Sequence, residues 1–182
     1  MGAATLVLMA MLATPLARLP ELTSVSQAAR AYFGQLEDDL EDLVAVVRKT
    51  SPYQPLTLLG HSAGGGFALR IASSPIQNLF ARTVLLAHFL GHDAPTYSHR
   101  LMRNFATRGY TSDFAAVTKP LTLISGADDE LMLADKYADA VAASVEVKLI
   151  DGISHMAIVS DPRAVSAIAE DVAKGGRNHD PH

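Results

Sequence analysis

The feature that most constrains this chain is a serine between two glycines, at the junction of an apolar run and a small-residue run. Gly60-His61-Ser62-Ala63-Gly64 follows Leu56–Leu59 and precedes Gly64–Ala72. A G-x-S-x-G pattern between a strand and a helix is typical of a nucleophile elbow, a tight turn that presents the serine hydroxyl. The two glycines let neighbouring backbone pass close by, and the helix start favours a developing anion. Ser62 is therefore a candidate nucleophile, and an ordinary glycine-rich loop is the alternative.

Short apolar strands alternate with helices along most of the chain, which has 182 residues and is 49% hydrophobic. This alternation predicts one α/β domain, residues 1–182, with a mostly parallel sheet and helices on both faces. An acidic cluster in the first helix is interpreted as its solvated face rather than a metal site. The predicted strands are Leu56–Leu59, Thr83–Ala87, Leu121–Ile124 and Val145–Ile150, and the predicted helices are Gln35–Lys49, Ala63–Ser73, Leu131–Ala143 and Pro162–Ala173.

Three segments depart from this alternation. Met1–Arg30 is atypical, and its apolar run is too short to span a bilayer. No Lys or Arg precedes that run, so a buried strand or helix is preferred to an export signal, and Ala4–Leu12 is a candidate edge strand. His88–Thr118 lacks a strong period and is predicted to be a short lid or cap insertion over the site. Gly175–His182 is predicted to be a flexible polar tail.

A serine nucleophile needs a base within hydrogen-bond reach, and the base needs an orienting acid. The chain supplies candidates in the order Ser, Asp, His, which suits this kind of turn. His155 follows the last predicted strand, and a surface loop histidine is the alternative. Asp128 and Asp129 both follow the Leu121–Ile124 strand. The Gly-x-x-Asp spacing from Gly126 favours Asp129 as the orienting acid, and Asp128 is the alternative. The aspartate that does not orient the histidine is expected to be solvated or to cap a helix.

Other residues are weaker candidates. His88 and His92, with Asp93 beside them, have the spacing of a metal pair, but nearby glycine and proline disfavour a helix, so no metal is predicted. His61 is expected to pack or to shape the pocket. Four aromatic residues could line an acyl pocket or pack within the lid: Tyr97, Phe105, Tyr110 and Phe114. Three further histidines are expected on the surface: His99, His179 and His182.

The composition excludes several classes of partner. The net charge is −4 and no basic run occurs, so nucleic acid is not expected. Cysteine is absent, which excludes disulfides, a thiol nucleophile and cysteine-ligated metals, and fits the cytoplasm. No integral membrane span is predicted. The expected location is cytoplasmic, and export or membrane association through the N-terminal apolar segment is the alternative.

Four stretches of the chain carry a resemblance to a known family: Tyr32–Leu40, Leu58–Gly66, Gly126–Glu130 and Gly152–His155. They resemble the α/β-hydrolase superfamily, within it the serine hydrolases that include monoacylglycerol lipases and lysophospholipases. The resemblance implies an α/β-hydrolase fold, no cofactor, and cleavage of small-molecule or lipid carboxylic esters through an acyl-enzyme. In that scheme Ser62 attacks, His155 shuttles the proton, Asp129 orients His155, and the Ala63 backbone N–H is one oxyanion-hole donor.

The chain departs from this family before the Ser62 motif. Members usually have several strands, a His-Gly oxyanion loop and an Arg-Gly-His-Gly-like turn there, and neither sequence occurs between Met1 and His61. We therefore expect an N-terminally truncated form of the fold. Missing strands would expose a sheet edge, through which two copies could form a homodimer. The alternative function is a catalytically impaired protein that only binds or is inactive, because losing an oxyanion donor costs about 10²–10³ in turnover.

Overall fold

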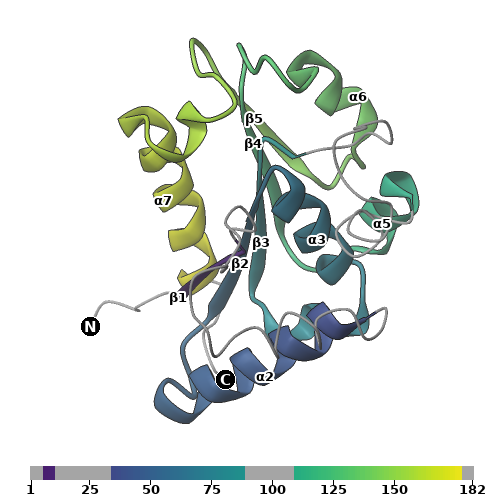
Figure 1. The fold of residues 1–182 in the computed structure, drawn as a ribbon, viewed down its shortest axis with the longest axis vertical. Coiled ribbons are helices and arrows are strands. Elements are labelled where there is room, and N and C mark those ends of the chain that lie inside the picture. Colours follow the sequence, from purple (N-terminus) through teal and green to yellow (C-terminus); the bar gives the residue numbers. More distant parts are fainter. Residues whose placement is uncertain (1–5, 11–33, 89–108, 178–182) are drawn as a thin grey trace, which may run out of the picture.

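The centre of the molecule is a parallel sheet of five strands. The computed structural model of the chain describes residues 6–10, 34–88 and 109–177. Within these ranges the strands lie in the order β1-β2-β3-β4-β5, and every neighbouring pair is parallel (Figure 1). Their carboxyl ends therefore meet at one edge of the sheet. The strands are β1 (Leu6–Ala10), β2 (Leu56–His61), β3 (Arg82–Leu86), β4 (Leu121–Gly126) and β5 (Glu146–Ile150).

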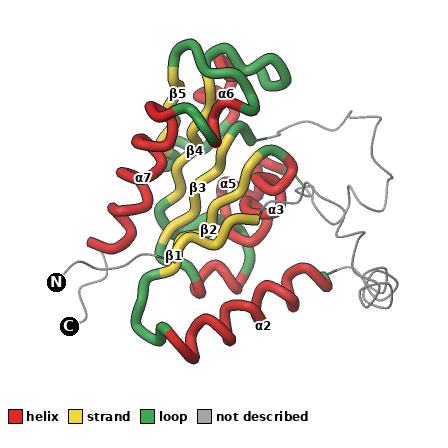
Figure 2. Tube along the Cα trace, turned by 60° about the vertical axis from the view of Figure 1, so that its left-hand side comes forward, coloured by secondary structure: helices red, strands yellow, loops and turns green. Residues whose placement is uncertain are grey.

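Helices cover both faces of this sheet, as the alternation of strands and helices predicted (Figure 2). One face packs against α2 (Gln35–Thr50), α3 (Ala63–Ala72), α5 (Tyr110–Ala116) and the short α6 (Tyr137–Ala140). The opposite face packs against α7 (Pro162–Arg177) and the 3₁₀ turn η4 (Ala157–Val159). A second 3₁₀ helix, η2 (Pro75–Leu79), links α3 to β3.

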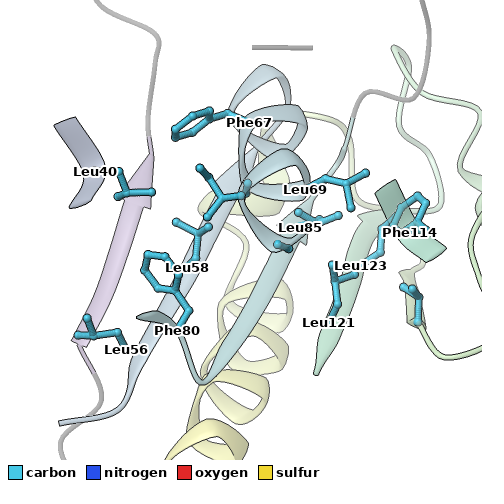
Figure 3. Close-up of a cluster of buried hydrophobic side chains, with 14 of the residues drawn as sticks. Leu40, Leu56, Leu58, Phe67, Leu69, Phe80, Leu85, Phe114, Leu121 and Leu123 are labelled. Atoms are coloured by element: carbon cyan, nitrogen blue, oxygen red, sulfur yellow. The ribbon is translucent and has the colours of Figure 1, made fainter. Parts of the chain in front are cut away.

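Alternate residues of β2, β3 and β4 enter the two cores. Leu58, Leu85 and Leu123 contribute to the core under α3, which Figure 3 shows in close-up. Leu59 and Val84, each next in sequence to one of these, contribute to the core under α7. This alternation follows from the two-residue period of a strand, and burial on both faces explains the continuous apolar runs of β2, β3 and β4.

Helix α2 has the amphipathic pattern that the sequence predicts. Leu40 and Val44 are buried in the core, with Leu36 and Val47 packed beside them. Asp38, Asp39, Glu41 and Asp42 are exposed, as expected for a solvated face. Glu37 is different, because its carboxylate pairs with the Arg70 guanidinium of α3 at 2.6 Å.

The N-terminal apolar run supplies β1. Leu6 pairs with Leu56 and Ala10 with Gly60, so β1 lies in parallel register beside β2. This confirms a strand within the Ala4–Leu12 stretch. The rest of the Met1–Arg30 segment lies outside the described residues. The carboxyl end of β1 is therefore next to Gly60, at the sheet edge that also carries Ser62.

The predicted helix over Leu131–Ala143 is wrong in its first half. The chain forms only a 3₁₀ turn, η3 (Ala134–Lys136), followed by α6. Before η3, the Asp129 Oδ1 atom accepts the backbone N–H groups of Leu131 and Met132 at 2.9 Å each, so the start of the predicted helix is instead a turn around this carboxylate. Ala134 and Tyr137 of this segment are nevertheless buried in the core.

The end of α7 differs slightly from the sequence-based prediction. The helix continues to Arg177, past Ala173 and into the segment expected to be a polar tail. The remainder of that tail, residues 178–182, lies outside the described residues, as does most of the predicted lid, residues 89–108. None of the helices in the described ranges is both long enough and apolar enough to cross a bilayer.

A buried ion-pair network ties α7 to the sheet at the end opposite the Ser62 edge. The Asp171 carboxylate of α7 is fully buried and lies 2.7 Å from the Arg82 guanidinium at the start of β3. The amino groups of Lys148 and Lys174 lie 3.3 and 3.1 Å from the other Asp171 oxygen. Arg82 also donates to Thr122 Oγ1 of β4 at 2.7 Å, so one carboxylate links α7 to three strands.

Candidate active site

Ser62 occupies a strained turn between β2 and α3. Its φ is 52° and its ψ is −117°, a conformation that L-residues rarely adopt and that costs of order 1–3 kcal/mol. Two backbone hydrogen bonds hold it: the Ser62 N–H donates to the Leu86 carbonyl, and the Gly65 N–H donates to the Ser62 carbonyl, both at 2.9 Å. The turn therefore has the strand–serine–helix form that the G-x-S-x-G pattern predicted.

The first glycine of the motif is required by a close approach of backbones. A Cβ added at Gly60 would lie 2.3 Å from the Gly64 carbonyl oxygen and 2.7 Å from the Ala68 Cβ. Neither neighbour can give way, because one is backbone and the other is the short side chain of a packed helix. The small residues of α3 therefore let the helix begin directly above the end of β2.

The structure brings His155 and Asp129 together. The His155 Nδ1 atom lies 2.9 Å from Asp129 Oδ2 and 3.2 Å from Oδ1, and both side chains are buried. A carboxylate can only accept, so Nδ1 carries the proton in this bond and Nε2 of the neutral ring is left as an acceptor. Asp128 is exposed instead. Of the two adjacent aspartates, Asp129 is the one that contacts the histidine.

The loop that carries His155 lies against the end of β4. A Cβ added at Gly126 would lie only 1.8 Å from the Ile153 carbonyl oxygen, so no other residue fits there without moving the backbone. Ile153 is fully buried, and the preceding Gly152 has a φ of +70°. This contact sets how far His155 lies from Asp129, which is three residues beyond Gly126.

Ser62 lies on the same sheet edge as this pair. The ring of His61, the residue before it, has its centroid 5.0 Å from that of the His155 ring. Ser62, Asp129 and His155 follow β2, β4 and β5, whose carboxyl ends share that edge. Ala63 is the first residue of α3, so its N–H has no acceptor within the helix.

Two further side chains contact His155 through its backbone, and the sequence reasoning missed both roles. Glu130 Oε2 accepts the His155 N–H at 2.9 Å, and this hydrogen bond lowers the pKa of the Glu130 carboxyl. The His61 Nε2 atom lies 3.3 Å from the His155 carbonyl oxygen, and burial lowers the pKa of His61. The only feature of the sequence that could have indicated these contacts is position, because Glu130 directly follows Asp129 and His61 directly precedes Ser62.

His88 is a buried histidine at the end of β3, next to the start of α3. Neither ring nitrogen has a hydrogen-bond partner among the described residues, and burial lowers the pKa of the ring to about 3. Its ring meets Phe114 edge to face, and its carbonyl accepts the Tyr137 hydroxyl at 2.6 Å. His92 and Asp93, the other members of the metal alternative, lie outside the described residues.

Acidification should destabilise the fold through His88. The pKa of His88 is about 6.5 in the unfolded chain and about 3 in the folded protein. Between these pH values only the unfolded chain binds the proton, so the free energy of unfolding falls as the pH falls. Between pH 7.5 and pH 5 we expect His88 to account for a loss of about 2 kcal/mol. Urea unfolding at both pH values should show a correspondingly smaller loss in His88→Leu. Equal losses in the two proteins would contradict this prediction.

The remaining aromatic residues and histidines singled out from the sequence either lie in the core or fall outside the described residues. Phe114 is buried in the core under α3, and Tyr110 packs against it, so the described half of the aromatic set serves core packing. Tyr97 and Phe105 lie outside the described residues, as do the histidines at 99, 179 and 182. Within the described ranges, no three His, Cys, Asp or Glu side chains are grouped as a metal site would need.

Comparisons with known proteins agree with this architecture. Residues 25–110, which include Ser62 but not Asp129 or His155, match the serine aminopeptidase family, S33. No curated protein is significantly similar in sequence. An α/β-hydrolase enzyme from a sediment metagenome of the Mar Chica lagoon, Morocco, aligns over 96% of this chain and 91% of its own, with a TM-score of 0.60 and 14% identity.

Two named enzymes have similar structures. The non-heme bromoperoxidase BpoC of Mycobacterium tuberculosis has a TM-score of 0.59 and 17% identity, over 80% of this chain and 75% of its own. A soluble variant of monoglyceride lipase from Saccharomyces cerevisiae has a TM-score of 0.52 and 15% identity, over 82% and 70%. At these identities the likeness concerns the fold. Together with the parallel sheet and the Ser62 turn, these matches show that the chain has the fold of the α/β hydrolases.

Proposed function

We propose that this protein is a serine hydrolase that cleaves carboxylic esters through an acyl-enzyme. The observation that carries the proposal is the buried hydrogen bond between His155 Nδ1 and Asp129, at the sheet edge that also holds the strained Ser62 turn. Asp129 fixes the tautomer of His155, which leaves Nε2 to accept the proton of a serine hydroxyl. The match of residues 25–110 to a serine aminopeptidase family and the fold shared with α/β hydrolases support the same chemistry.

The residues would divide the reaction as follows. Ser62 Oγ attacks the ester carbonyl carbon while His155 Nε2 accepts its proton, and the carbonyl oxygen becomes an oxyanion near the Ala63 N–H. The carbon–oxygen bond to the alcohol then breaks, and His155 gives its proton to the departing alcohol. Water attacks the acyl-enzyme with His155 again as the base, which releases the acid and restores Ser62.

Exposed apolar side chains next to the acid and the base favour an apolar acyl group. Leu131, Leu133 and Met156 are 66%, 76% and 62% exposed, and they follow Asp129 and His155 closely in sequence. An acyl chain that covered them would gain about 0.8 kcal/mol for each buried CH₂ group. We therefore propose monoacylglycerol-like or lysophospholipid-like esters, or small esters, as the substrate class. A monoglyceride lipase among the similar structures is in keeping with this proposal.

Labelling with a fluorophosphonate tests the proposal directly, because this reagent reacts only with an activated serine. We expect one label per chain, mapped by peptide mass spectrometry to Ser62, and none in Ser62→Ala. Ser160→Ala is the matched control, since Ser160 is an exposed serine in a turn, and it should label like the unmodified protein. Turnover of p-nitrophenyl esters from acetate to decanoate then reports the acyl preference.

Folded protein that takes up no label and turns over no ester would contradict the proposal. Circular dichroism and a cooperative urea transition establish that the protein is folded in that comparison. The result would favour the alternative function, a protein of this fold that binds without turnover. Label at a serine other than Ser62 would contradict the assignment of the nucleophile.

A further inference from the structure

The peptide group of His155 is held by one side chain from the end of β2 and one from the loop that follows β4. On one side the His155 N–H donates to Glu130 Oε2 at 2.9 Å. On the other side the His155 carbonyl oxygen lies 3.3 Å from His61 Nε2. The imidazole ring is held separately, by Asp129. His155 therefore has contacts at its ring, its N–H and its carbonyl, and they come from the last residue of β2 and the loop that follows β4.

Glu130 is well suited to hold the N–H. The hydrogen bond from His155 lowers the pKa of the Glu130 carboxyl, so the acceptor is a carboxylate, which binds an N–H more strongly than a neutral acceptor does. Glu130 is also the next residue after Asp129. One short stretch of chain therefore contacts both the ring and the backbone of His155, and neither contact can shift without the other.

His61 is suited to hold the carbonyl. A carbonyl oxygen only accepts, so the His61 Nε2 atom carries the proton in this contact. Burial lowers the pKa of His61, which keeps its ring neutral. A neutral donor is appropriate here, because the centroids of the two rings are only 5.0 Å apart and a second positive charge would oppose protonation of His155. His61 also lies directly before Ser62, so this contact links the base to the turn of the nucleophile.

We propose that His61 and Glu130 are positioning residues that fix the His155 backbone, and through it the distance from the imidazole to Ser62. This inference rests on the proposed function, in which His155 accepts the proton of Ser62. A displacement of about 1 Å at such a base costs on the order of 10²-fold in rate. The two contacts therefore act on kcat, and neither is expected to change substrate affinity.

Glu130 can be tested with a pair of variants. Glu130→Ala removes the acceptor and should lower kcat and the fluorophosphonate labelling rate by about 10- to 100-fold, with KM unchanged. Glu130→Gln keeps an acceptor oxygen and should recover most of that loss. Glu41→Ala, which removes an exposed carboxylate from α2, is the matched control and should leave both rates unchanged. Full activity in Glu130→Ala would overturn the role of Glu130.

His61 can be tested in the same way. His61→Phe keeps an aromatic ring against His155 but removes the N–H donor, and it should lower kcat by about tenfold or more. His61→Gln keeps a donor N–H and should be the more active of the two. The opposite order, with phenylalanine better than glutamine, would show that His61 acts only by packing and would overturn its role as a donor.

Hydrogen exchange separates this inference from the proposed function. The His155 amide should exchange at least tenfold faster in Glu130→Ala than in the unmodified protein, while the urea midpoint stays the same. This readout needs no activity, so it tests the contact even if the protein fails to label. A protein that labels at Ser62 but shows unchanged exchange and unchanged rates in the variants would overturn the inference and leave the proposed function standing.

Discussion

Asp129→Asn should lower kcat by about 10⁴-fold while leaving the protein folded. In the structure, Asp129 Oδ1 accepts the N–H groups of Leu131 and Met132, and Oδ2 faces His155 Nδ1. An asparagine must keep its oxygen on the two N–H donors, so its amide NH₂ would face the histidine. His155 would then accept at Nδ1 and carry its proton on Nε2, the tautomer that cannot take a proton from Ser62.

The measurement is kcat and KM on a p-nitrophenyl ester, with circular dichroism to establish folding. Asp128→Asn is the matched control, because Asp128 is the adjacent aspartate and is exposed, and its kcat should stay within about twofold of the unmodified protein. An Asp129→Asn protein that keeps more than a tenth of kcat would contradict the assigned role. A large loss in Asp128→Asn would show that the wrong aspartate had been chosen.

Asp171→Asn should lower the free energy of unfolding by about 3–5 kcal/mol, because it removes one partner from a buried ion pair and leaves the other charged. The stranded partner is Arg82, which is almost fully buried 2.7 Å from the carboxylate. Lys148 and Lys174 also lose a partner, but both side chains are partly exposed. Urea unfolding at pH 7 measures the effect, and the adjacent exposed Glu170→Gln is the control, with an expected change below about 0.5 kcal/mol.

The contribution of Asp171 to the free energy of unfolding should fall at low pH. Burial by itself raises the pKa of Asp171, but the hydrogen bond from Thr122 and the positive charge of Arg82 outweigh it, so the pKa lies below its usual value. The carboxylate therefore stabilises the folded protein fully above the unfolded pKa of about 3.9, and this contribution is lost as the pH falls through the lower folded value. Asp171→Asn should show no such loss below pH 4. An Asp171→Asn protein as stable as the original at pH 7 would contradict the prediction.

The sequence predicted those features of the candidate site that depend on local pattern. The Ser62 turn follows from small residues after an apolar run, and the positions of Asp129 and His155 follow from the rule that loops after parallel strands share one edge. The strands were predicted to within two residues at each end, and the clearest of them, β2, β3 and β4, are apolar runs buried on both faces.

Contacts between distant segments could not be predicted in this way. The helix expected from Leu131 was wrong in its first half, and periodicity does not reveal that Asp129 Oδ1 accepts the N–H groups of Leu131 and Met132. The pairing of Arg82 with Asp171 joins residues far apart in the sequence, and neither lies in a recognisable motif. His61 and Glu130 contact the backbone of His155. Every residue type has the same backbone groups, so the sequence carries no pattern that marks such a contact.

The contact at Gly126 has a consequence for altering the substrate range of this protein. The gap between β4 and the His155 loop is closed by backbone, with an added Cβ 1.8 Å from the Ile153 carbonyl, so position 126 admits no larger residue. Leu131 and Leu133, which follow β4, and Met156, which follows His155, are largely exposed and admit almost any side chain. Under the proposed function, a mutagenesis library that varies these three positions and keeps Gly126 fixed should change acyl preference without separating His155 from Asp129.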